Sequence, residues 1–151
     1  MKHLSIAIFV AAIAVSSFHS VKADDHKNHS AEAHAVHLLG GYFGVSDALY
    51  KSDLDAAKTA ASAIITHDKN SALAVAASAV VEADDLAVAR ESFKKLSARA
   101  IQLAEQNAKG KFIVMHCPMV KGGSGDWLSS DGKVNNPYFG SKMPHCGGPK
   151  N

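Results

Sequence analysis

The segment from about residue 31 to residue 108 constrains the fold most, because its apolar residues recur with the period of an α-helix. Apolar side chains spaced three and four residues apart share one helical face, and that face must be buried against a partner. The longest such series has six members: Leu86, Ala89, Phe93, Leu96, Ala100 and Leu103. Four segments of this kind with short connections predict a mainly α protein, an antiparallel four-helix bundle.

Capping and turn residues set the expected helix boundaries. The helices are expected at about Ala31–Lys51, from Ser52 to a turn at residues 67–70, at about Ser71–Glu82, and from Asp84 or Asp85 to near Gly110. Within the first helix, Gly40 and Gly41 predict a kink or a close contact between helices. The third helix is rich in Ala and Val and short of charge, so we expect burial on most of its sides.

The first 23 residues have the organisation of a secretory signal peptide. Leu4–Val15 is an apolar run of twelve residues, too short for a usual membrane span, and Val21-Lys22-Ala23 is a small-residue cleavage site. An uncleaved membrane anchor is the alternative. The sequence therefore predicts an exported, periplasmic or secreted protein. We expect a disordered arm at residues 24–30 and one domain, with a bundle at residues 31–109 and a cap at residues 110–151.

Charge argues against two classes of partner. The full chain has a formal net charge of +2 with neutral histidines. Cleavage after Ala23 removes Lys2 and Lys22 and leaves fourteen basic residues against fourteen acidic ones. A neutral mature chain gives no reason to expect binding to nucleic acid or to an anionic membrane surface.

After Gly110 the composition changes to that of a loop-rich cap. Lys111–Met115 is a candidate short strand, and clusters of Gly, Asn, Asp and Pro mark turns after it. Asn136–Gly140 combines turn and aromatic residues, which favours a structural turn that covers the end of the bundle together with Trp127. A rim around a bound cation or a docking patch is the alternative. A cap with so little regular structure needs a cross-link, either a disulfide or a metal.

Two donor-rich clusters in the cap carry the chemistry of this chain. Each holds His, Cys and Met within five residues: His116, Cys117 and Met119 in one, and Met143, His145 and Cys146 in the other. Thiolate, thioether and imidazole groups suit a soft or borderline metal ion. Two thiolates with one thioether or imidazole predict a Cu(I) site, whereas two thiolates with both histidines predict a zinc site.

A disulfide between Cys117 and Cys146 is the alternative to a metal. Export to an oxidising compartment permits it, and closing a loop of about thirty residues contributes roughly 3–4 kcal/mol of stability. Oxidation would remove both thiolates and release a bound metal, so the two states can alternate.

The N-terminal arm offers a second possible metal site. Cleavage after Ala23 would leave Asp24-Asp25-His26 as the new N-terminus. The free amine, two backbone amides and the His26 imidazole then form a square-planar set suited to Cu(II) or Ni(II). His34 and His37 extend the histidine run and share one helical face. A solvated polar tail without metal is the alternative.

No grouping of residues favours an enzyme. The cysteines do not form a C-x-x-C pair, which argues against a thioredoxin-like oxidoreductase. The glycines at residues 122–125 lie among turn residues rather than between a strand and a helix, so they do not predict a phosphate-binding loop.

Five motifs follow one another along the chain: R-x-x-F-x-x-L-S at residues 90–97, H-C-P-M at 116–119, G-x-W-L at 125–128, N-P-Y-F-G-S-K-M at 136–143 and C-G at 146–147. In this order they resemble a bacterial family of exported domains of unknown function. This family is also similar to the C-terminal module of periplasmic adaptor subunits of copper and heavy-metal efflux systems. The resemblance covers about residues 31–147. It implies a small helical domain with a cysteine-bearing cap and a role near metal handling, and it does not imply an enzyme.

These observations predict an exported protein that binds a soft metal, copper first and zinc second. It would sequester the metal or deliver it to a periplasmic component of an efflux system. The alternative function is a disulfide-stabilised periplasmic interaction module without metal.

Overall fold

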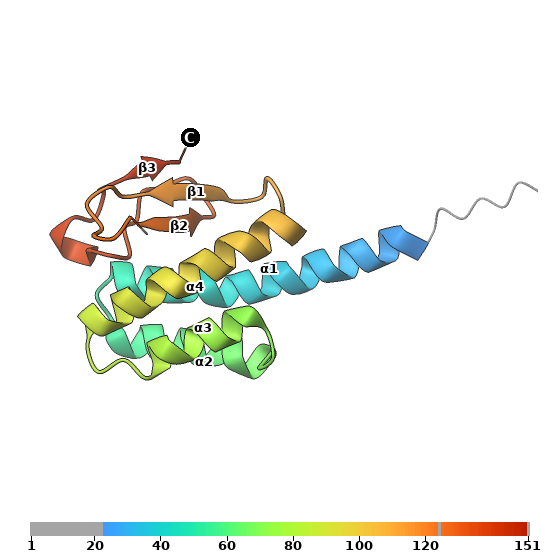
Figure 1. Cartoon of the computed structure of the whole chain (residues 1–151), viewed down its shortest axis with the longest axis horizontal. Coiled ribbons are helices and arrows are strands. Elements are labelled where there is room, and N and C mark those ends of the chain that lie inside the picture. The colour runs from blue at the N-terminus through green and yellow to red at the C-terminus, as the bar shows by residue number, and fades with distance from the viewer. Residues whose placement is uncertain (1–22, 124, 151) are drawn as a thin grey trace, which may run out of the picture.

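The computed structural model describes residues 23–123 and 125–150, with side chains from residue 30 onward. The predicted signal peptide lies outside these residues except for Ala23. The described chain forms four α-helices followed by a small sheet (Figure 1). The helices are α1, Ala23–Tyr50; α2, Leu54–His67; α3, Ala72–Val81; and α4, Leu86–Asn107.

The four helices form a closed bundle, as the periodicity predicts. Each helix packs against the next, and α4 returns to pack against α1. In Figure 1, α1 and α4 lie between the sheet on one side and the α2–α3 pair on the other. The mainly α fold with a C-terminal cap is therefore confirmed, and the cap rests on the α1–α4 layer.

Helix α1 begins earlier than the sequence predicts. It starts at Ala23 rather than at about Ala31, so residues 24–30 are helical where a disordered arm is expected. No glycine or proline interrupts the chain between Ala23 and Gly40, and alanine recurs there, so the helix can extend. This N-terminal part of α1 projects beyond the ends of the other helices (Figure 1).

Side-chain caps fix the starts of the other helices. Asp53, Ser71 and Asp85 each accept a backbone N–H of the first helical turn. The prediction that Ser52 caps α2 is therefore wrong. Ser52 instead has a left-handed backbone, with φ of 60°, and its Oγ accepts a hydrogen bond from Arg90.

Small residues let α1 and α2 approach closely. A Cβ added at Gly41 would lie 2.6 Å from Ile64 Cγ1, and one at Gly44 would lie 3.1 Å from the Ala60 Cβ. The predicted close contact at the Gly40–Gly41 pair is therefore real and belongs to Gly41. Helix α3 is covered on most of its sides, as predicted: within Ala72–Val81 only Ala72 and Val75 are exposed, and Val75 is 69% exposed.

The cap contains a three-stranded antiparallel sheet that sequence analysis predicts only as one strand. Its strands are β1, Ile113–His116; β2, Asp126–Ser129; and β3, Gly148–Pro149; a short 3₁₀ helix, η1, spans Gly140–Lys142. The strand order is β2-β1-β3. Met115 pairs with Trp127, and His116 pairs with Asp126 on one side and Gly148 on the other. The last strand thus returns the end of the chain to β1.

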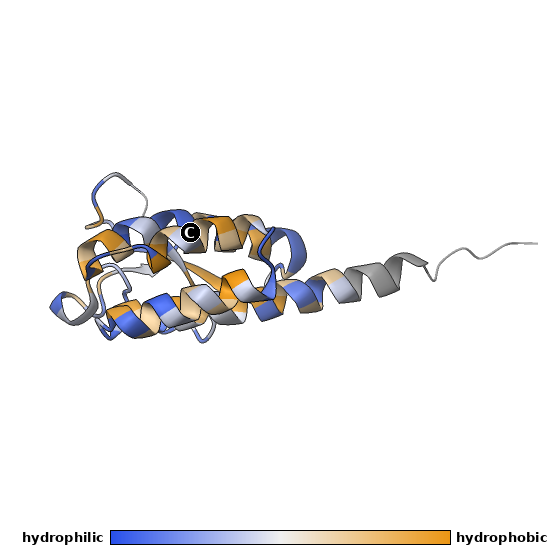
Figure 2. Cartoon of the chain, turned by 90° about the horizontal axis from the view of Figure 1, so that it is seen from below, coloured by the Kyte–Doolittle hydropathy of each residue, from blue (hydrophilic) through white to orange (hydrophobic). Residues whose placement is uncertain are grey.

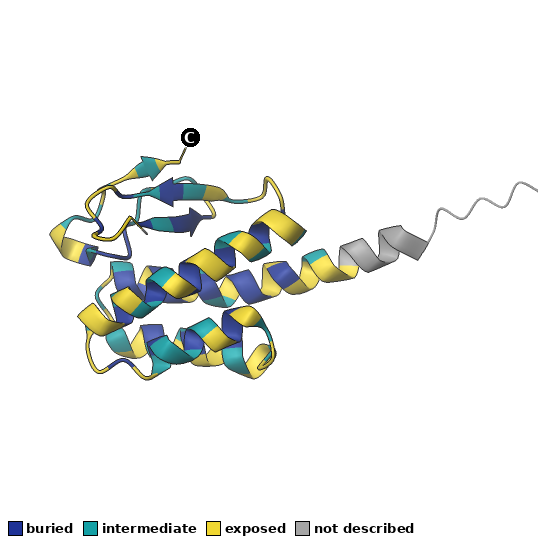
Figure 3. Cartoon of the chain, viewed as in Figure 1, coloured by how far each residue is buried: buried dark blue, intermediate teal, exposed yellow. Residues whose placement is uncertain are grey.

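Bundle and cap share one hydrophobic core. Tyr42 and Phe93 stack with ring centroids 5.4 Å apart, and Tyr138 meets Phe93 at 5.6 Å and Trp127 at 6.2 Å. Polar and apolar residues interleave along each helix (Figure 2), and the buried positions face the layers between them (Figure 3). Over the described residues, the helices do not include one with the length and apolar character to cross a membrane.

A chain of hydrogen bonds joins α1, α4 and β2 inside this core. Leu128 N–H donates to the Tyr42 hydroxyl at 3.0 Å, and the Ser97 hydroxyl donates to the Asp126 carbonyl at 2.8 Å. The Tyr42 and Ser97 oxygens are 2.9 Å apart. Because Ser97 uses its proton on Asp126, Tyr42 is the donor between them. Burial raises the pKa of Tyr42, so the hydroxyl stays protonated and can donate.

Candidate functional site

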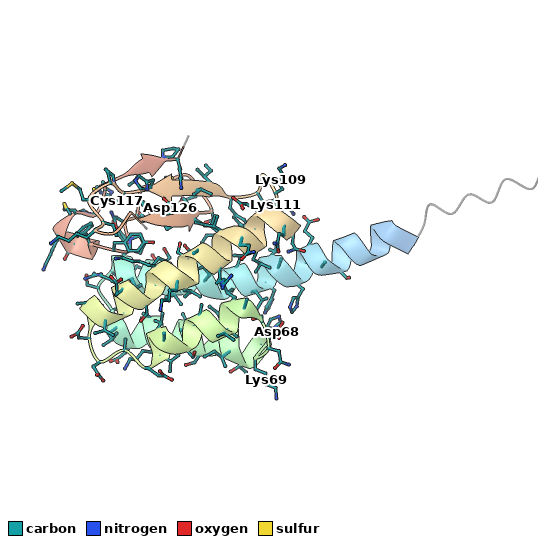
Figure 4. All side chains as sticks on the ribbon, viewed as in Figure 1. Asp68, Lys69, Lys109, Lys111, Cys117 and Asp126 are labelled. Carbon is teal, nitrogen blue, oxygen red and sulfur yellow. The ribbon has the colours of Figure 1, made fainter. Side chains whose placement is uncertain are left out.

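Two thiols meet at one end of the cap sheet. Cys117 directly follows β1 and is fully buried, whereas Cys146 lies half-buried in the turn before β3. Their Sγ atoms are 2.8 Å apart, and both cysteines are free thiols. Cys117 is labelled in Figure 4 beside the sulfur atoms of this region. The structure therefore brings together the two residues that the sequence singles out, although 29 positions separate them in the chain.

Asn136 and Gly147 fix the path of the chain around Cys146. The buried Asn136 donates from Nδ2 to the Cys146 carbonyl at 2.7 Å, and its backbone N–H donates to the Pro144 carbonyl at 2.9 Å. Gly147 has φ of 121°, and a Cβ there would lie 2.6 Å from the His116 carbonyl oxygen. The turn that presents Cys146 is thus held from both sides, by an amide anchor and by a close backbone approach.

The sulfur separation suits two kinds of chemistry. A disulfide has an S–S length of about 2.05 Å, so closing the pair needs an approach of less than about 1 Å. Two thiolates on one tetrahedral metal, with metal–sulfur bonds of about 2.3 Å, lie roughly 3.8 Å apart, so chelation needs a similar movement in the opposite direction. The hydrogen bond with the Cys117 thiol raises the pKa of Cys146, because a shared proton is lost on ionisation.

The methionines of both clusters lie near Cys146. A hydrogen bond from the backbone of Met119 reaches the Cys146 thiol, and the Met119 side chain is 59% exposed. Met143 is half-buried, and its carbonyl accepts the Cys146 N–H at 3.3 Å. Both thioethers are therefore held on segments that contact the Cys146 turn.

The histidines of the clusters are engaged elsewhere. His116 alternates with the buried Met115 and Cys117, which places its ring on the outer face of β1. There its Nδ1 lies 2.6 Å from Asp126 Oδ1. His145 Nδ1 donates to the Val134 carbonyl at 2.8 Å. Across the part of the chain that the structure describes, no three His, Cys, Asp or Glu side chains already converge as the ligands of a preformed metal site, so any metal site requires side chains to rotate.

Asp126 is a residue that the sequence analysis missed. Partial burial opposes its ionisation, but hydrogen bonds from Lys150 and His116 outweigh burial and lower the pKa of its carboxyl. Lys150 Nζ lies 2.6 Å from Asp126 Oδ2. The pairing of β2 with β1 brings Asp126 opposite His116. This contact can be found from the sequence only by predicting the register of the two strands.

The turn at residues 136–140, called the aromatic turn below, is held in place by hydrogen bonds to the rest of the protein. Asn136 Oδ1 accepts the Tyr138 N–H at 2.8 Å, and the Tyr138 hydroxyl donates to the Asp126 carbonyl. Arg90 donates from Nε to the Pro137 carbonyl at 3.1 Å and from Nη2 to the Leu49 carbonyl at 3.0 Å. These contacts attach the turn to α1 and α4, which agrees with its predicted role of covering the bundle.

The predicted square-planar site at the N-terminus stays a prediction. Asp24, Asp25 and His26 lie in the helical part of α1, and their side chains are outside those described. Such a site needs a free amine at Asp24, and it also requires the first turn to leave the helix, because helical backbone cannot place the amine and the next two amide nitrogens in one plane around an ion.

Comparison with known proteins finds a family whose model matches part of the chain. Residues 38–111 match the model of a family described as Protein of unknown function (DUF3347). The matched segment runs from α1 to just beyond α4 and stops before the cysteines. No curated protein and no solved structure matches the chain. The match supports the resemblance to domains of unknown function, and the likeness to efflux adaptor modules stays an expectation.

Proposed function

We propose that this protein is exported and binds one soft metal ion, Cu(I), which it sequesters or delivers to an efflux system. The observation that carries the proposal is the convergence of the free thiols of Cys117 and Cys146 at 2.8 Å. The donors are soft, and one of the two thiols is half-exposed, so an ion can reach the pair. The efflux partner rests on the resemblance of the sequence motifs alone.

The ligand set that fits best is two thiolates with one thioether. Chelation needs a sulfur movement of only about 1 Å, which the half-exposed Cys146 side chain can make by rotation within its anchored turn. Cys117 is fixed in the core by its buried position and by the hydrogen bond from its N–H to the Gly125 carbonyl. Met119 can supply the third ligand, because its side chain is exposed and its backbone already contacts Cys146. Zinc is the second candidate metal, and a Cys2His2 set would require both histidines to turn toward the thiols.

Cu(I) affinity, measured anaerobically by competition with a chromophoric chelator, tests this proposal. We expect near-stoichiometric binding that Cys117→Ser and Cys146→Ser each abolish, while far-UV circular dichroism shows that the helices survive. Met119→Leu should weaken binding by about tenfold or more. His116→Asn and His145→Asn are the matched controls and should leave the affinity unchanged. Undiminished binding in both cysteine variants would defeat the proposal.

A disulfide-stabilised interaction module is the second candidate function. The same 2.8 Å separation favours it, because the two sulfurs need to move together by less than about 1 Å to form the bond. Metal content and free thiols, measured together on protein purified without chelator from the exported fraction, separate the candidates. One copper or zinc per chain with both thiols protected supports the metal site. No metal and no free thiol after denaturation supports the disulfide.

A further inference from the structure

Three imidazoles and a carboxylate gather at the end of the bundle where α2 turns into α3. His34 and His37 come from α1, His67 is the last residue of α2, and Asp68 follows it. The ring centroids of His37 and His67 are 4.1 Å apart, and those of His34 and His67 are 5.2 Å apart. His34 Nε2 lies 3.2 Å from Asp68 Oδ2. Figure 4 labels Asp68 at this turn, beside α1 and far from Cys117.

The packing of α1 on α2 brings these residues together. His34 and His37 are one helical turn apart and flank the buried Ala35 and Leu38, so they edge the face that α1 turns toward its neighbours. All three imidazoles are exposed, and His34 keeps 48% of its side chain in solvent. The hydrophobic core therefore does not require histidine at these positions, and the cluster is open to an ion from outside.

We propose that His34, His37 and His67, together with Asp68, bind a divalent metal ion of borderline softness, with Zn(II) as the representative ion. Three imidazole nitrogens and one carboxylate oxygen are a common donor set for tetrahedral zinc. The site goes beyond the proposed copper function, because it uses none of the cap residues and no sulfur. Its donors are harder than the thiol pair, so it selects a different ion.

The spacing of the rings is close to what such a site needs. Two imidazoles on one tetrahedral zinc, with Zn–N bonds of about 2.0–2.1 Å, have ring centroids roughly 5 Å apart. The His34–His67 pair already has this spacing at 5.2 Å, and the His37–His67 pair must open by about 1 Å from its 4.1 Å. The rings are stacked or tilted rather than converged on one point, so binding requires rotation about χ1 and χ2. Exposed side chains make such rotations within nanoseconds.

A metal at this cluster would tie α1 to the end of α2. The link would act at the base of the part of α1 that projects beyond the other helices (Figure 1). Binding to the folded protein alone raises its stability by RT ln(1 + L/Kd), where L is the concentration of free zinc. Zinc should therefore raise the melting temperature of the whole chain, and it should do so through residues of two different helices.

Zinc titration of the Cys117→Ser/Cys146→Ser double variant isolates this cluster from the thiols. We expect isothermal titration calorimetry to give one Zn(II) per chain and an upward shift of Tm. His34→Asn, His37→Asn and His67→Asn should each weaken zinc binding by about tenfold or more. His145→Asn, an exposed histidine in the cap, is the matched control and should bind as before. Co(II) should give the visible bands of a tetrahedral nitrogen–oxygen site without a sulfur charge-transfer band.

The triple variant His34→Asn/His37→Asn/His67→Asn decides the question. Zinc uptake in this variant equal to that of its parent would overturn the proposal, and so would a parent that takes up no zinc. Where the double cysteine variant fails to fold, the same histidine substitutions in the otherwise unmodified chain give the answer. In that background, zinc should raise Tm by less than it does in the unsubstituted protein. The protein should also bind one equivalent fewer of the Co(II) whose spectrum lacks sulfur charge-transfer bands, while Cu(I) binding at the thiols stays unchanged.

Discussion

Gly147 controls where Cys146 sits, because the backbone beside it leaves no room for a side chain. A Cβ at this position would lie 2.6 Å from the His116 carbonyl oxygen and 2.8 Å from Trp127 Cη2, and the φ of 121° is one that other residues rarely adopt. We expect Gly147→Ala to lower the free energy of unfolding by about 3 kcal/mol, from backbone strain and overpacking together. Urea denaturation followed by circular dichroism measures this loss.

Gly148→Ala is the control for that prediction. A Cβ at Gly148 meets no atom within 4 Å, so we expect a change within about 0.5 kcal/mol. Equal losses in the two variants would show that the effect comes from glycine in general rather than from the contact with His116 and Trp127.

Asp126 makes the stability of the cap depend on pH. Its folded-state pKa is lowered by Lys150 and His116 despite partial burial, so its ionised form is favoured in the folded protein. A depressed folded pKa contributes stability that is present above the unfolded value of about 3.9 and is lost as pH falls through the folded value. Asp126→Asn should lower stability by about 1 kcal/mol at pH 7 and by less at pH 2–3. Urea midpoints of both proteins across pH 2–7 test this; a constant difference would contradict it.

At the scale of elements, Tyr42 joins the bundle to the sheet. It accepts the Leu128 N–H of β2 and donates to Ser97 of α4 within a fully buried core. Tyr42→Phe leaves that N–H without a partner, and an unsatisfied buried donor costs about 1–3 kcal/mol. Tyr50→Phe in the same helix is the control, and we expect a change within about 0.5 kcal/mol. Chemical denaturation of both variants, with Ser97→Ala to complete a double-mutant cycle, measures the coupling; additive losses would show that the residues act separately.

At the scale of the whole molecule, the shared core predicts that bundle and cap unfold together. Trp127 is the only tryptophan and lies in the cap, so its fluorescence reports on the sheet while far-UV circular dichroism reports on the helices. We expect the two urea transitions to coincide, which is the mark of two-state unfolding. A fluorescence transition at lower urea would show that the cap opens first and is a separate unit.

Oxidation of the thiol pair should stabilise that whole unit. A Cys117–Cys146 disulfide closes a loop of about thirty residues, so we expect oxidised protein to exceed reduced protein by roughly 3–4 kcal/mol in the chain-entropy model. Denaturation with and without reductant measures the difference. The Cys117→Ser/Cys146→Ser variant should not respond to reductant, and a response there would assign the effect to something other than this pair.

Much of the fold could be predicted because helices are local structures. The apolar series from Leu86 to Leu103 predicts α4, and Asp85, one of its two candidate caps, does cap it, since capping joins residues two or three positions apart. The structure explains the R-x-x-F-x-x-L-S motif of α4. Arg90 donates to the Pro137 carbonyl in the aromatic turn, Phe93 packs against Tyr138 in the core, and Ser97 donates to the Asp126 carbonyl of β2. The prediction places the N-cap of α2 one residue too early, at Ser52, because the neighbouring Asp53 is an equally good capping residue.

The sequence by itself determined the helices and the presence of soft donors in the last part of the chain, because these follow from neighbours along the chain. Tertiary structure alone decided which donors meet. It joined Cys117 to Cys146, turned His116 outward to Asp126, and set His67 and Asp68 against α1. Strand register and helix packing make these choices, and both depend on contacts between residues far apart in the sequence.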